Sequence, residues 1–424
     1  MTREKEKPNE RVDMQKRRKM NKFKHLLILL TLVAFLPSCT TIKAIKMVNG
    51  SEAVPNSHFE SVVPFALEGH PILIKARLNN SQKEYVFIFD TGALTIIRQE
   101  VAKELNLAQG IEIEGNDSAG KSKTINLVKF EKVIVGNMEV RDCAAAVTDF
   151  SGIFAPNIAG ILGSNFFRHF KVTIDYRKKE IILSQEKKRS TVQTNSLTIP
   201  FETDMKIGFA PVIECMVDDK IEGTAIIDTG FPGIVSLPLA MTKETNSFKA
   251  GNVTASKGSM TFGLFGRTDK DYVVRIDAFK VGGLKLKNIP SSSNSLKAGH
   301  ILLGNKFLEN FLVTLNYPMK EMILTPYGTP FETNIPTYGL ALAKERNKTI
   351  VSGIWDNSSA SSSGINLGDE VVKVNSMEVN TLSLMELGSI FLDMSINILE
   401  IEYSNDKGIQ KVILHKGMLL PVLK

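Results

Sequence analysis

The sequence predicts a mainly β protein, made of one β-rich unit that occurs twice and a shorter domain after it. Short runs of Val, Ile and Phe are bounded by Gly, Asn, Asp and Ser throughout the chain, a pattern typical of strands and turns. Two sequence blocks occur twice in the same order, about 140 residues apart, and the last ninety or so residues differ from both copies. The length of 424 residues agrees with about two to three domains of ~150 residues each.

The first recurring block is an apolar run that ends in Asp-Thr-Gly. Its two copies are Tyr85-Val-Phe-Ile-Phe-Asp90-Thr91-Gly92 and Thr224-Ala-Ile-Ile-Asp228-Thr229-Gly230. The second block contains an apolar-apolar-Gly triplet, at 161–163 and 302–304, and each copy then ends in a short apolar run, at 180–183 and 321–324. Because both blocks keep their order and spacing, we interpret the chain as an internal duplication.

Local patterns predict the elements within the copies. A helix is expected at 98–107, because Val101, Ala102 and Leu105 have helical spacing. The strands that we expect are at residues 73–78, 86–89, 133–135, 172–174, 225–227 and 272–276.

The net charge of +7 is concentrated at the N-terminus. Residues 1–24 contain ten Lys or Arg and four Asp or Glu, so the rest of the chain is nearly neutral. This distribution indicates no nucleic-acid partner. An apolar run at 26–36 follows the basic stretch, which is the layout of a secretion signal, and it is shorter than the ~20 residues that span a bilayer.

The apolar run ends in Leu36-Pro37-Ser38-Cys39, which resembles the lipobox of bacterial lipoproteins. The resemblance implies that residues 1–39 are a lipoprotein signal with its diacylated Cys39. It also implies a lipid anchor in a membrane of the bacterial cell envelope, at the periplasmic side of the outer membrane or at the cell surface. The alternative is an ordinary or uncleaved signal with an incidental Cys. Residues 40–58 are mixed and polar-rich, and we expect them to be a tether.

Two cysteines remain, and the chain lacks the common metal and cofactor motifs. Cys143 and Cys215 could pair with each other or be buried singly, and the sequence leaves both possibilities open. There is no His-Glu-x-x-His, Cys-x-x-Cys or phosphate-loop glycine pattern. Neither a metal nor an organic cofactor is therefore expected.

The two Asp-Thr-Gly triplets are candidate catalytic loops. A single triplet is more often a turn, because Asp and Gly favour turns. Two triplets at equivalent places in a duplicated unit can lie near a pseudo-twofold axis, where Asp90 and Asp228 meet and share a proton. One carboxylate would then act as general base on a water molecule while the other donates to a scissile carbonyl. The alternative is a duplicated β protein whose aspartates only cap turns.

The residues after each aspartate suit the catalytic interpretation. The hydroxyls of Thr91 and Thr229 could hydrogen-bond across the axis and fix the two loops. Gly92 and Gly230 lack a Cβ where the backbone must approach a carboxylate and donate to it.

Residues 59–330 resemble the retropepsin and pepsin-type aspartic peptidases in a two-lobed, single-chain form. The similarity rests on Phe89-Asp90-Thr91-Gly92-Ala93 and on the two apolar-apolar-Gly triplets. It implies two β-barrel lobes, at 59–190 and 191–330, with Asp90 and Asp228 as the catalytic pair. The implied activity is endopeptidase hydrolysis of polypeptide substrates without a cofactor.

The chain departs from this family after its second triplet, where Phe231-Pro232 replaces the usual Ser, Thr or Ala. Neither triplet is followed by a hydroxyl that would stabilise ionised carboxylates. We therefore expect a pH optimum nearer neutral than that of gastric enzymes. The loops at 116–121 and 258–266 are candidate hairpins that close over substrate, or else they are ordinary exposed loops.

The last segment, 331–424, resembles the PDZ domains of bacterial envelope proteases. Ser358, Ala360, Gly364, Gly368 and Asp369 match that family's Ser-x-Ala-x-x-x-Gly-x-x-x-Gly-Asp pattern. The resemblance places a carboxylate-binding loop at Tyr338-Gly339-Leu340, where backbone N–H groups would capture a C-terminal or extended peptide.

Two functions from different classes remain possible on the sequence. One is an active aspartic endopeptidase whose PDZ domain docks substrate or regulates access. The other is an inactive protein of the same fold that acts as a PDZ-mediated peptide-binding module. The two intact triplets favour the enzyme, and Phe231 and Pro232 favour the binding protein.

Overall fold

A computed structural model describes residues 39–420 except 68, 108–109, 118, 187, 190–192, 295–298, 332 and 335. The chain divides into two compact units, residues 1–46 and 47–424. The predicted signal over residues 1–38 and the side chain of Cys39 lie outside what is described. Part of the expected tether is helical, in α2 (Cys39–Asn49). Among the described residues, no helix is long and apolar enough to cross a membrane.

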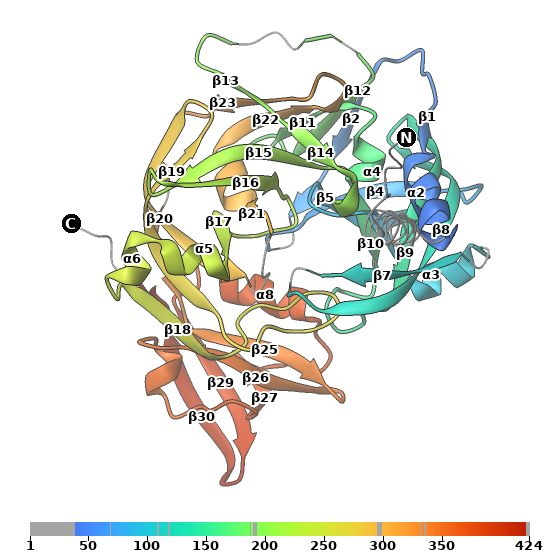
Figure 1. Cartoon of the computed structure of the whole chain (residues 1–424). Coiled ribbons are helices and arrows are strands. Elements are labelled where there is room, and N and C mark those ends of the chain that lie inside the picture. Colours follow the sequence, from blue (N-terminus) through green and yellow to red (C-terminus); the bar gives the residue numbers. More distant parts are fainter. Residues whose placement is uncertain are drawn as a thin grey trace, which may run out of the picture. The chain divides into compact units, whose positions relative to one another are not determined.

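The first copy forms a closed β-barrel (Figure 1). Its strands follow one another in the sheet order β9, β6, β10, β5, β4 and β8, and β8 pairs again with β9 to close the ring. Strands β1, β3 and β7 extend it, and α3 (Gln99–Glu104) and α4 (Ser164–Phe167) both contact β9. The strands, in chain order, are β1 (Glu52–Ala53), β3 (Ala66–Leu67), β4 (Ile72–Leu78), β5 (Glu84–Asp90), β6 (Ile96–Arg98), β7 (Ile111–Asn116), β8 (Ser122–Val135), β9 (Met138–Thr148) and β10 (Ile158–Gly163).

The second copy repeats this barrel. The sheet order β20, β17, β21, β16, β15 and β19 matches the order in the first barrel, and β19 pairs again with β15. This equivalence confirms the mainly β, duplicated architecture that the two sequence blocks predict. The elements are β14 (Glu202–Asp204), η1 (Met205–Ile207), β15 (Ala210–Val217), β16 (Ile221–Ile227), β17 (Val235–Pro238), α5 (Leu239–Glu244), α6 (Asn246–Lys249), β18 (Val253–Gly258), β19 (Tyr272–Val281), β20 (Leu284–Asn294), β21 (Ile301–Leu303) and α7 (Asn305–Leu308).

A six-stranded sheet joins the two copies. Its central strands β11 and β22, one from each copy, are antiparallel, and Thr173 lies opposite Thr314. Their hydroxyls are 2.9 Å apart. Because these threonines hold equivalent positions in the two copies, their pairing marks the pseudo-twofold axis. The sheet consists of β13 (Leu197–Pro200), β23 (Glu321–Pro326), β22 (Phe311–Asn316), β11 (Lys171–Asp175), β12 (Glu180–Ser184) and β2 (Glu60–Pro64), with η2 (Tyr317–Met319) after β22.

The C-terminal segment forms its own small hydrophobic core, and its sheet is continuous with the second barrel. The continuity comes from β18, which pairs with β26 so that Ser256 lies opposite Trp355 (Figure 1). Helix α8 begins with a capping box made by Ser383 and Glu386. The elements are β24 (Pro336–Thr337), β25 (Leu340–Glu345), β26 (Lys348–Trp355), η3 (Ala360–Ser362), β27 (Glu370–Val374), β28 (Met377–Glu378), α8 (Leu384–Leu392), β29 (Ile398–Asn405), β30 (Gly408–His415) and β31 (Gly417–Met418).

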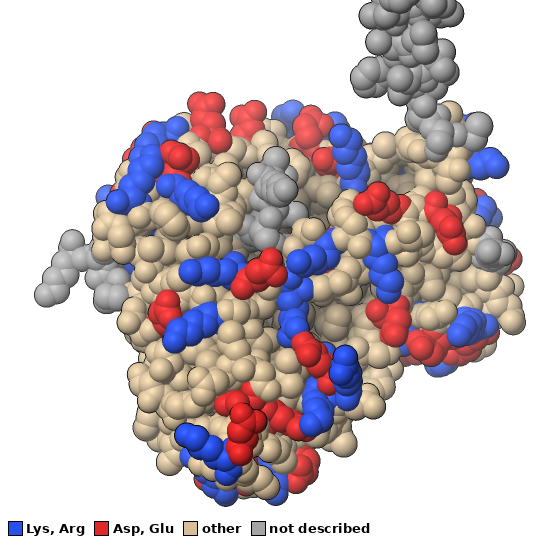
Figure 2. Space-filling model, turned by 60° about the horizontal axis from the view of Figure 1, so that its bottom comes forward, with Lys and Arg blue, Asp and Glu red and all other residues tan. Residues whose placement is uncertain are grey.

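All six expected strands are present, and the expected helix is shorter than predicted. Helix α3 ends at Glu104 because Asn106 adopts a left-handed backbone conformation (φ 50°). The N–H of Leu107 then donates to the carbonyl of Ala102, which closes the helix end. On the face of the molecule in Figure 2, acidic and basic side chains are interspersed, as the nearly neutral charge after the N-terminus leads one to expect.

Candidate active site

The two aspartates lie at the ends of equivalent strands. Alternate side chains of β5 face opposite ways, so that Phe87 and Phe89 enter the barrel core while Asp90 faces outward. The apolar-apolar-Gly triplet lies beside this strand, with Gly163 of β10 opposite Asp90. In the second copy, the N–H of Asp228 donates to the carbonyl of Leu303, 2.9 Å away. In both copies, the buried strand with the apolar-apolar-Gly triplet therefore holds the Asp-Thr-Gly loop in place.

Thr91 and Thr229 join the two loops through reciprocal hydrogen bonds. The hydroxyl of Thr91 donates to the carbonyl of Ile227 (2.6 Å) and accepts from the N–H of Thr229 (3.2 Å). The hydroxyl of Thr229 donates to the carbonyl of Phe89 (3.0 Å) and accepts from the N–H of Thr91 (3.0 Å). Both threonines are fully buried. The threonine of each loop thus provides hydrogen-bond partners for buried backbone groups of the other loop.

The carboxyl groups of Asp90 and Asp228 meet across the axis. The N–H of Gly92 donates to Oδ1 of Asp90 (2.7 Å), and the N–H of Gly230 donates to Oδ1 of Asp228 (2.9 Å). A Cβ placed on Gly92 would lie 2.6 Å from Cγ of Asp228, and one on Gly230 would lie closer still to the carboxylate of Asp90. Only glycine fits at these two positions.

The pKa values of both carboxyl groups are raised. Burial is the largest cause for each of them. For Asp90, the N–H of Gly92 and a hydrogen bond with Asp228 partly offset the rise in pKa. For Asp228, the charge of Asp90 raises the pKa further, well above the ordinary value of 3.8. The pair therefore keeps one shared proton to a higher pH than an isolated aspartate would.

The two candidate hairpins contact each other. The first, at 116–121, joins β7 to β8, and Asp117 within it accepts hydrogen bonds from Ala119 and Lys121. The other carboxylate oxygen of Asp117 accepts from the N–H of Phe265 in the second hairpin, 2.7 Å away. The buried carboxylate of Asp117 thus links hairpins from both copies.

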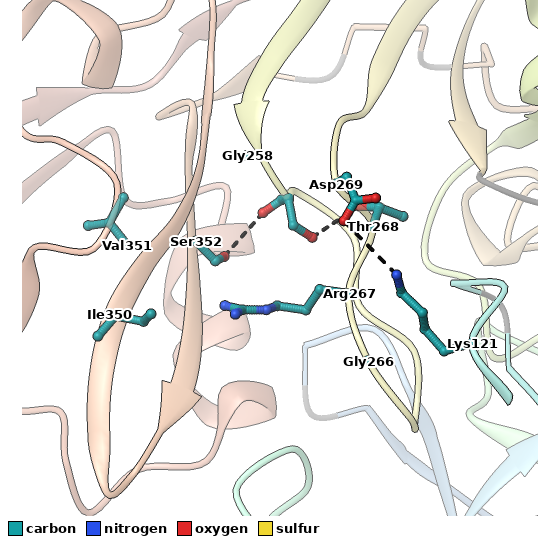
Figure 3. A pocket seen from close by; sticks show the side chains of 10 residues that line it. Lys121, Gly258, Gly266, Arg267, Thr268, Asp269, Ile350, Val351 and Ser352 are labelled. Atoms are coloured by element: carbon teal, nitrogen blue, oxygen red, sulfur yellow. Dashed lines mark hydrogen bonds and ion pairs between the residues drawn. The ribbon is translucent and has the colours of Figure 1, made fainter. Parts of the chain in front are cut away.

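The second hairpin is also attached to the C-terminal segment. Ser259 donates from its N–H to the carbonyl of Ser352 in β26 (2.8 Å), and the hydroxyl of Ser352 donates back to the carbonyl of Ser259 (3.1 Å). Arg267 forms an ion pair with Glu345 of β25. Between these elements lies a cavity of about 550 Å³ (Figure 3), whose lining does not include either aspartate.

Helix α8 lies against the first barrel, on the face of β5 that carries Asp90. The N–H groups of Leu384 and Met385 donate to the carbonyls of Gly152 (2.8 Å) and Ile153 (2.9 Å). The side chain of Met385 and that of Leu264, in the second hairpin, each pack against a buried cluster that contains Ile88. Ile88 precedes Asp90 by two residues and so shares its face. No pattern in the sequence indicates this contact.

The predicted carboxylate-binding loop lies in the C-terminal segment, apart from the two aspartates. The ring of Tyr338 is buried against Phe391, and its hydroxyl donates to the carbonyl of Ile396 (2.6 Å). The N–H of Gly339, whose φ is +84°, donates to the hydroxyl of Thr337 (3.1 Å). The side chain of Tyr338 and the N–H of Gly339 therefore already have partners within the chain.

Strand β25, which follows this loop, has an open edge. It pairs only with β26 among the described residues. The N–H of Trp355 donates to the carbonyl of Gly339. In an antiparallel ladder alternate residues point to opposite edges, so the backbone groups of Leu340 face away from β26.

The alternatives for the two cysteines are settled by their positions. Cys143 and Cys215 are both free and buried. Burial raises the pKa of each thiol to about 12. Both are therefore inert, singly buried residues. No cluster of three or more His, Cys, Asp or Glu that could hold a metal occurs in the described part of the chain.

Comparison with known proteins finds a similarity in the first copy. Residues 74–166 match the family model of aspartyl protease. That stretch contains Asp90-Thr91-Gly92 and the Gly163 triplet, so the similarity to aspartyl proteases covers the first copies of both recurring blocks. One solved structure, titled "Crystal structure of edgp", is similar at 11% identity and a TM-score of 0.38, over 64% of this chain and 96% of that chain. No curated protein has a sequence that matches this chain.

Proposed function

We propose that the protein is an aspartic endopeptidase in which Asp90 and Asp228 activate a water molecule. The observation that carries the proposal is the reciprocal bonding of Thr91 and Thr229, because it brings two equivalent carboxyl groups together at the centre of a duplicated fold. The family match over the first copy supports it. So do the raised pKa values, since two facing carboxylates that share one proton can supply both an acid and a base.

The proposed reaction needs only the aspartate pair, water and a peptide bond. The ionised carboxylate takes a proton from the water as its oxygen attacks the scissile carbonyl carbon, and the protonated carboxyl donates its proton to the carbonyl oxygen. The tetrahedral gem-diol then collapses: one of its hydroxyls returns a proton to the ionised carboxylate as the C=O bond re-forms, the C–N bond breaks, and the protonated carboxyl gives its proton to the leaving amine. The pair finishes with one proton, as it began.

The C-terminal segment is proposed to be a PDZ domain that docks peptides or regulates access to the aspartates. The open edge of β25 supports docking, since an extended peptide can add to such an edge as a further strand. The contacts of Met385 with the first barrel, and of Ser352 with the second hairpin, support regulation of access. Both roles use the same helix α8, because it contacts β25 as well as the first barrel.

The cellular setting is proposed from the sequence. Diacylation of Cys39 would anchor the protein to a membrane of the bacterial envelope, on the periplasmic side of the outer membrane or at the cell surface. Its partners there would be polypeptide substrates, with no role for nucleic acid. A form that lacks residues 1–39 is accordingly the natural soluble version for assays.

The second candidate is a peptide-binding protein without catalytic activity. Phe231 and Pro232 after the second triplet, and the packing of Met385 and Leu264 on the face that carries Asp90, favour it. This candidate predicts peptide binding by the soluble form but no cleavage at any pH.

The deciding experiment measures cleavage of an unfolded protein by the soluble form from acid to neutral pH. Asp90→Asn and Asp228→Asn remove one carboxylate each, and Asp406→Asn, in an exposed turn, is the matched control. We expect both active-site variants to lose cleavage and the control to keep it. Cleavage that survives in Asp90→Asn and Asp228→Asn would refute the proposal, and no cleavage by a folded parent would support the binding protein.

A second experiment tests whether the C-terminal segment restricts access. Met385→Arg places a charge in the apolar contact with the first barrel, whereas Met394→Arg changes an exposed methionine in the same segment. If α8 restricts access, Met385→Arg should cleave faster than the parent and Met394→Arg should not. Equal rates for all three proteins would remove regulation from the proposal.

A further inference from the structure

Behind the catalytic loops, two buried polar side chains hold equivalent places in the two copies. Ser164 and Asn305 each follow the glycine of an apolar-apolar-Gly triplet, and each begins a short helix, α4 or α7. Ser164 is 0% exposed and Asn305 is 4% exposed. Neither has a role in the proposed chemistry so far, and both contact the peptide units next to the aspartates.

In the first copy, Ser164 connects the catalytic loop to a tyrosine of the second copy. Its hydroxyl donates to the carbonyl of Thr91, 2.7 Å away. The hydroxyl of Tyr317 also lies 2.7 Å from this oxygen. Serine has one hydroxyl proton, which it uses on Thr91, so Tyr317 is the donor to Ser164.

In the second copy, Asn305 makes the equivalent connection to a tyrosine of the first. Its Nδ2 donates to the carbonyl of Thr229 (2.6 Å) and to that of His70 (3.2 Å). Its Oδ1 accepts from the hydroxyl of Tyr176, 2.7 Å away. Tyr176 and Tyr317 follow the two central strands of the joint sheet at equivalent positions. The two connections therefore cross the pseudo-twofold axis in opposite directions.

Each connection ends on an aspartate through a single peptide unit. The carbonyl of Thr91 and the N–H of Gly92 belong to the same peptide, and that N–H donates to Oδ1 of Asp90. The carbonyl of Thr229 and the N–H of Gly230 are related in the same way, and that N–H donates to Asp228. A hydrogen bond to the carbonyl of a peptide polarises it, which strengthens donation by its N–H.

We propose that Tyr317 and Tyr176 are positioning residues, each acting through a hydrogen-bonded relay on the aspartate of the other copy. One relay runs from Tyr317 through Ser164 and the Thr91–Gly92 peptide to Asp90. The other runs from Tyr176 through Asn305 and the Thr229–Gly230 peptide to Asp228. The inference rests on the proposed function.

Through the two relays, the six-stranded sheet that joins the copies affects hydrogen-bond donation to the aspartates. The donors remain protonated throughout the working range, because burial raises the pKa of both phenols above its ordinary value. A rotation of one lobe against the other at β11 and β22 would move each tyrosine away from its acceptor. The alignment of the two lobes is thus coupled to the strength of the hydrogen bonds that the aspartates accept.

The test uses Tyr317→Phe, which deletes one donor and keeps the ring. Tyr85→Phe is the matched control, since its hydroxyl also has a partner, Glu104, and it lies on β5 outside the relay. Loss of one hydrogen bond should lower kcat by about two- to tenfold in Tyr317→Phe, with KM little changed. The acid limb of the pH profile should move to higher pH by about 0.3 unit, because Asp90 receives weaker donation.

A double variant separates the relay from general loss of packing. Ser164→Ala breaks the same relay one link further on, so adding Tyr317→Phe to it should shift the acid limb no further. Shifts that add in the double variant would overturn the relay, as would a Tyr317→Phe profile equal to that of Tyr85→Phe.

A titration of the carboxyl groups distinguishes failure of the relay from failure of the proposed enzyme. Nuclear magnetic resonance of aspartate labelled with ¹³C at Cγ measures the pKa of the pair in the folded protein without any cleavage. If the parent is inactive, the relay still predicts a higher pKa for Asp90 in Tyr317→Phe than in Tyr85→Phe. Equal pKa values in these two variants would overturn it.

Discussion

Thr91→Val should destabilise the protein through the loss of hydrogen bonds between the two Asp-Thr-Gly loops. Valine keeps the size and branching of threonine but can neither donate nor accept. The change leaves the carbonyl of Ile227 and the N–H of Thr229 without their partner, and Thr91 is fully buried. An unpaired buried backbone group costs about 1–3 kcal/mol, so we expect a loss of about 3 kcal/mol in the free energy of unfolding.

Thr91→Ser is the control for this change. Serine keeps the hydroxyl and loses one methyl group, which should cost about 0.8 kcal/mol. The hydrogen bonds to Ile227 and Thr229 can then persist. The difference between the two variants, about 2 kcal/mol, belongs to the hydroxyl itself.

Urea unfolding followed by circular dichroism measures both variants against the parent. With a slope of about 3 kcal/mol per M, Thr91→Val should lower the midpoint by about 1 M. Fluorescence of Trp355, the only tryptophan of the chain, follows the C-terminal segment separately. Equal midpoints for Thr91→Val and Thr91→Ser would refute the argument that the hydroxyl joins the loops.

Three further predictions concern the aspartate pair and the thiols. The raised pKa of Asp228 favours its protonated form only in the folded state, so the stability of the parent falls as pH rises through that pKa. Asp228→Asn should therefore unfold at a higher temperature than the parent at pH 7 but not at about pH 4. Gly230→Ala should abolish cleavage in a protein that circular dichroism shows to be folded, since its Cβ would overlap the opposite carboxylate. In the form without residues 1–39, Cys143 and Cys215 should react with a thiol reagent at pH 8 only after urea is added, since burial raises both pKa values to about 12; rapid reaction of the folded protein would contradict the buried positions.

Much of the barrel architecture could be predicted because short sequence patterns indicate its strands. The apolar run Tyr85-Val-Phe-Ile-Phe is enough to predict a strand, and the recurrence of such a run before Asp228 predicts a second equivalent one. The helix after β6 was predicted too long, because spacing of Val101, Ala102 and Leu105 carries no information about the left-handed turn at Asn106.

The C-terminal segment shows how a motif can indicate a loop without fixing the role of its side chains. Tyr338-Gly339-Leu340 was expected to bind a peptide carboxylate. That prediction concerns backbone N–H groups, and it leaves open the role of the Tyr338 ring, which packs on Phe391 in the core because an aromatic side chain next to an apolar cluster gains more from burial than from exposure. The proposed peptide site uses the backbone edge of β25, which pairs only with β26 among the described residues.

The duplication, the strands and the two aspartates can be predicted without a structure, since they follow from spacing along the chain. Which side chains meet depends on the three-dimensional fold. The contacts of Tyr317 and Tyr176 with the opposite copy depend on the antiparallel pairing of β11 with β22. The packing of Met385 against the buried cluster that contains Ile88 depends on the fold of the C-terminal segment. Such contacts join residues far apart in sequence, and their free energy depends on geometry that no local pattern records.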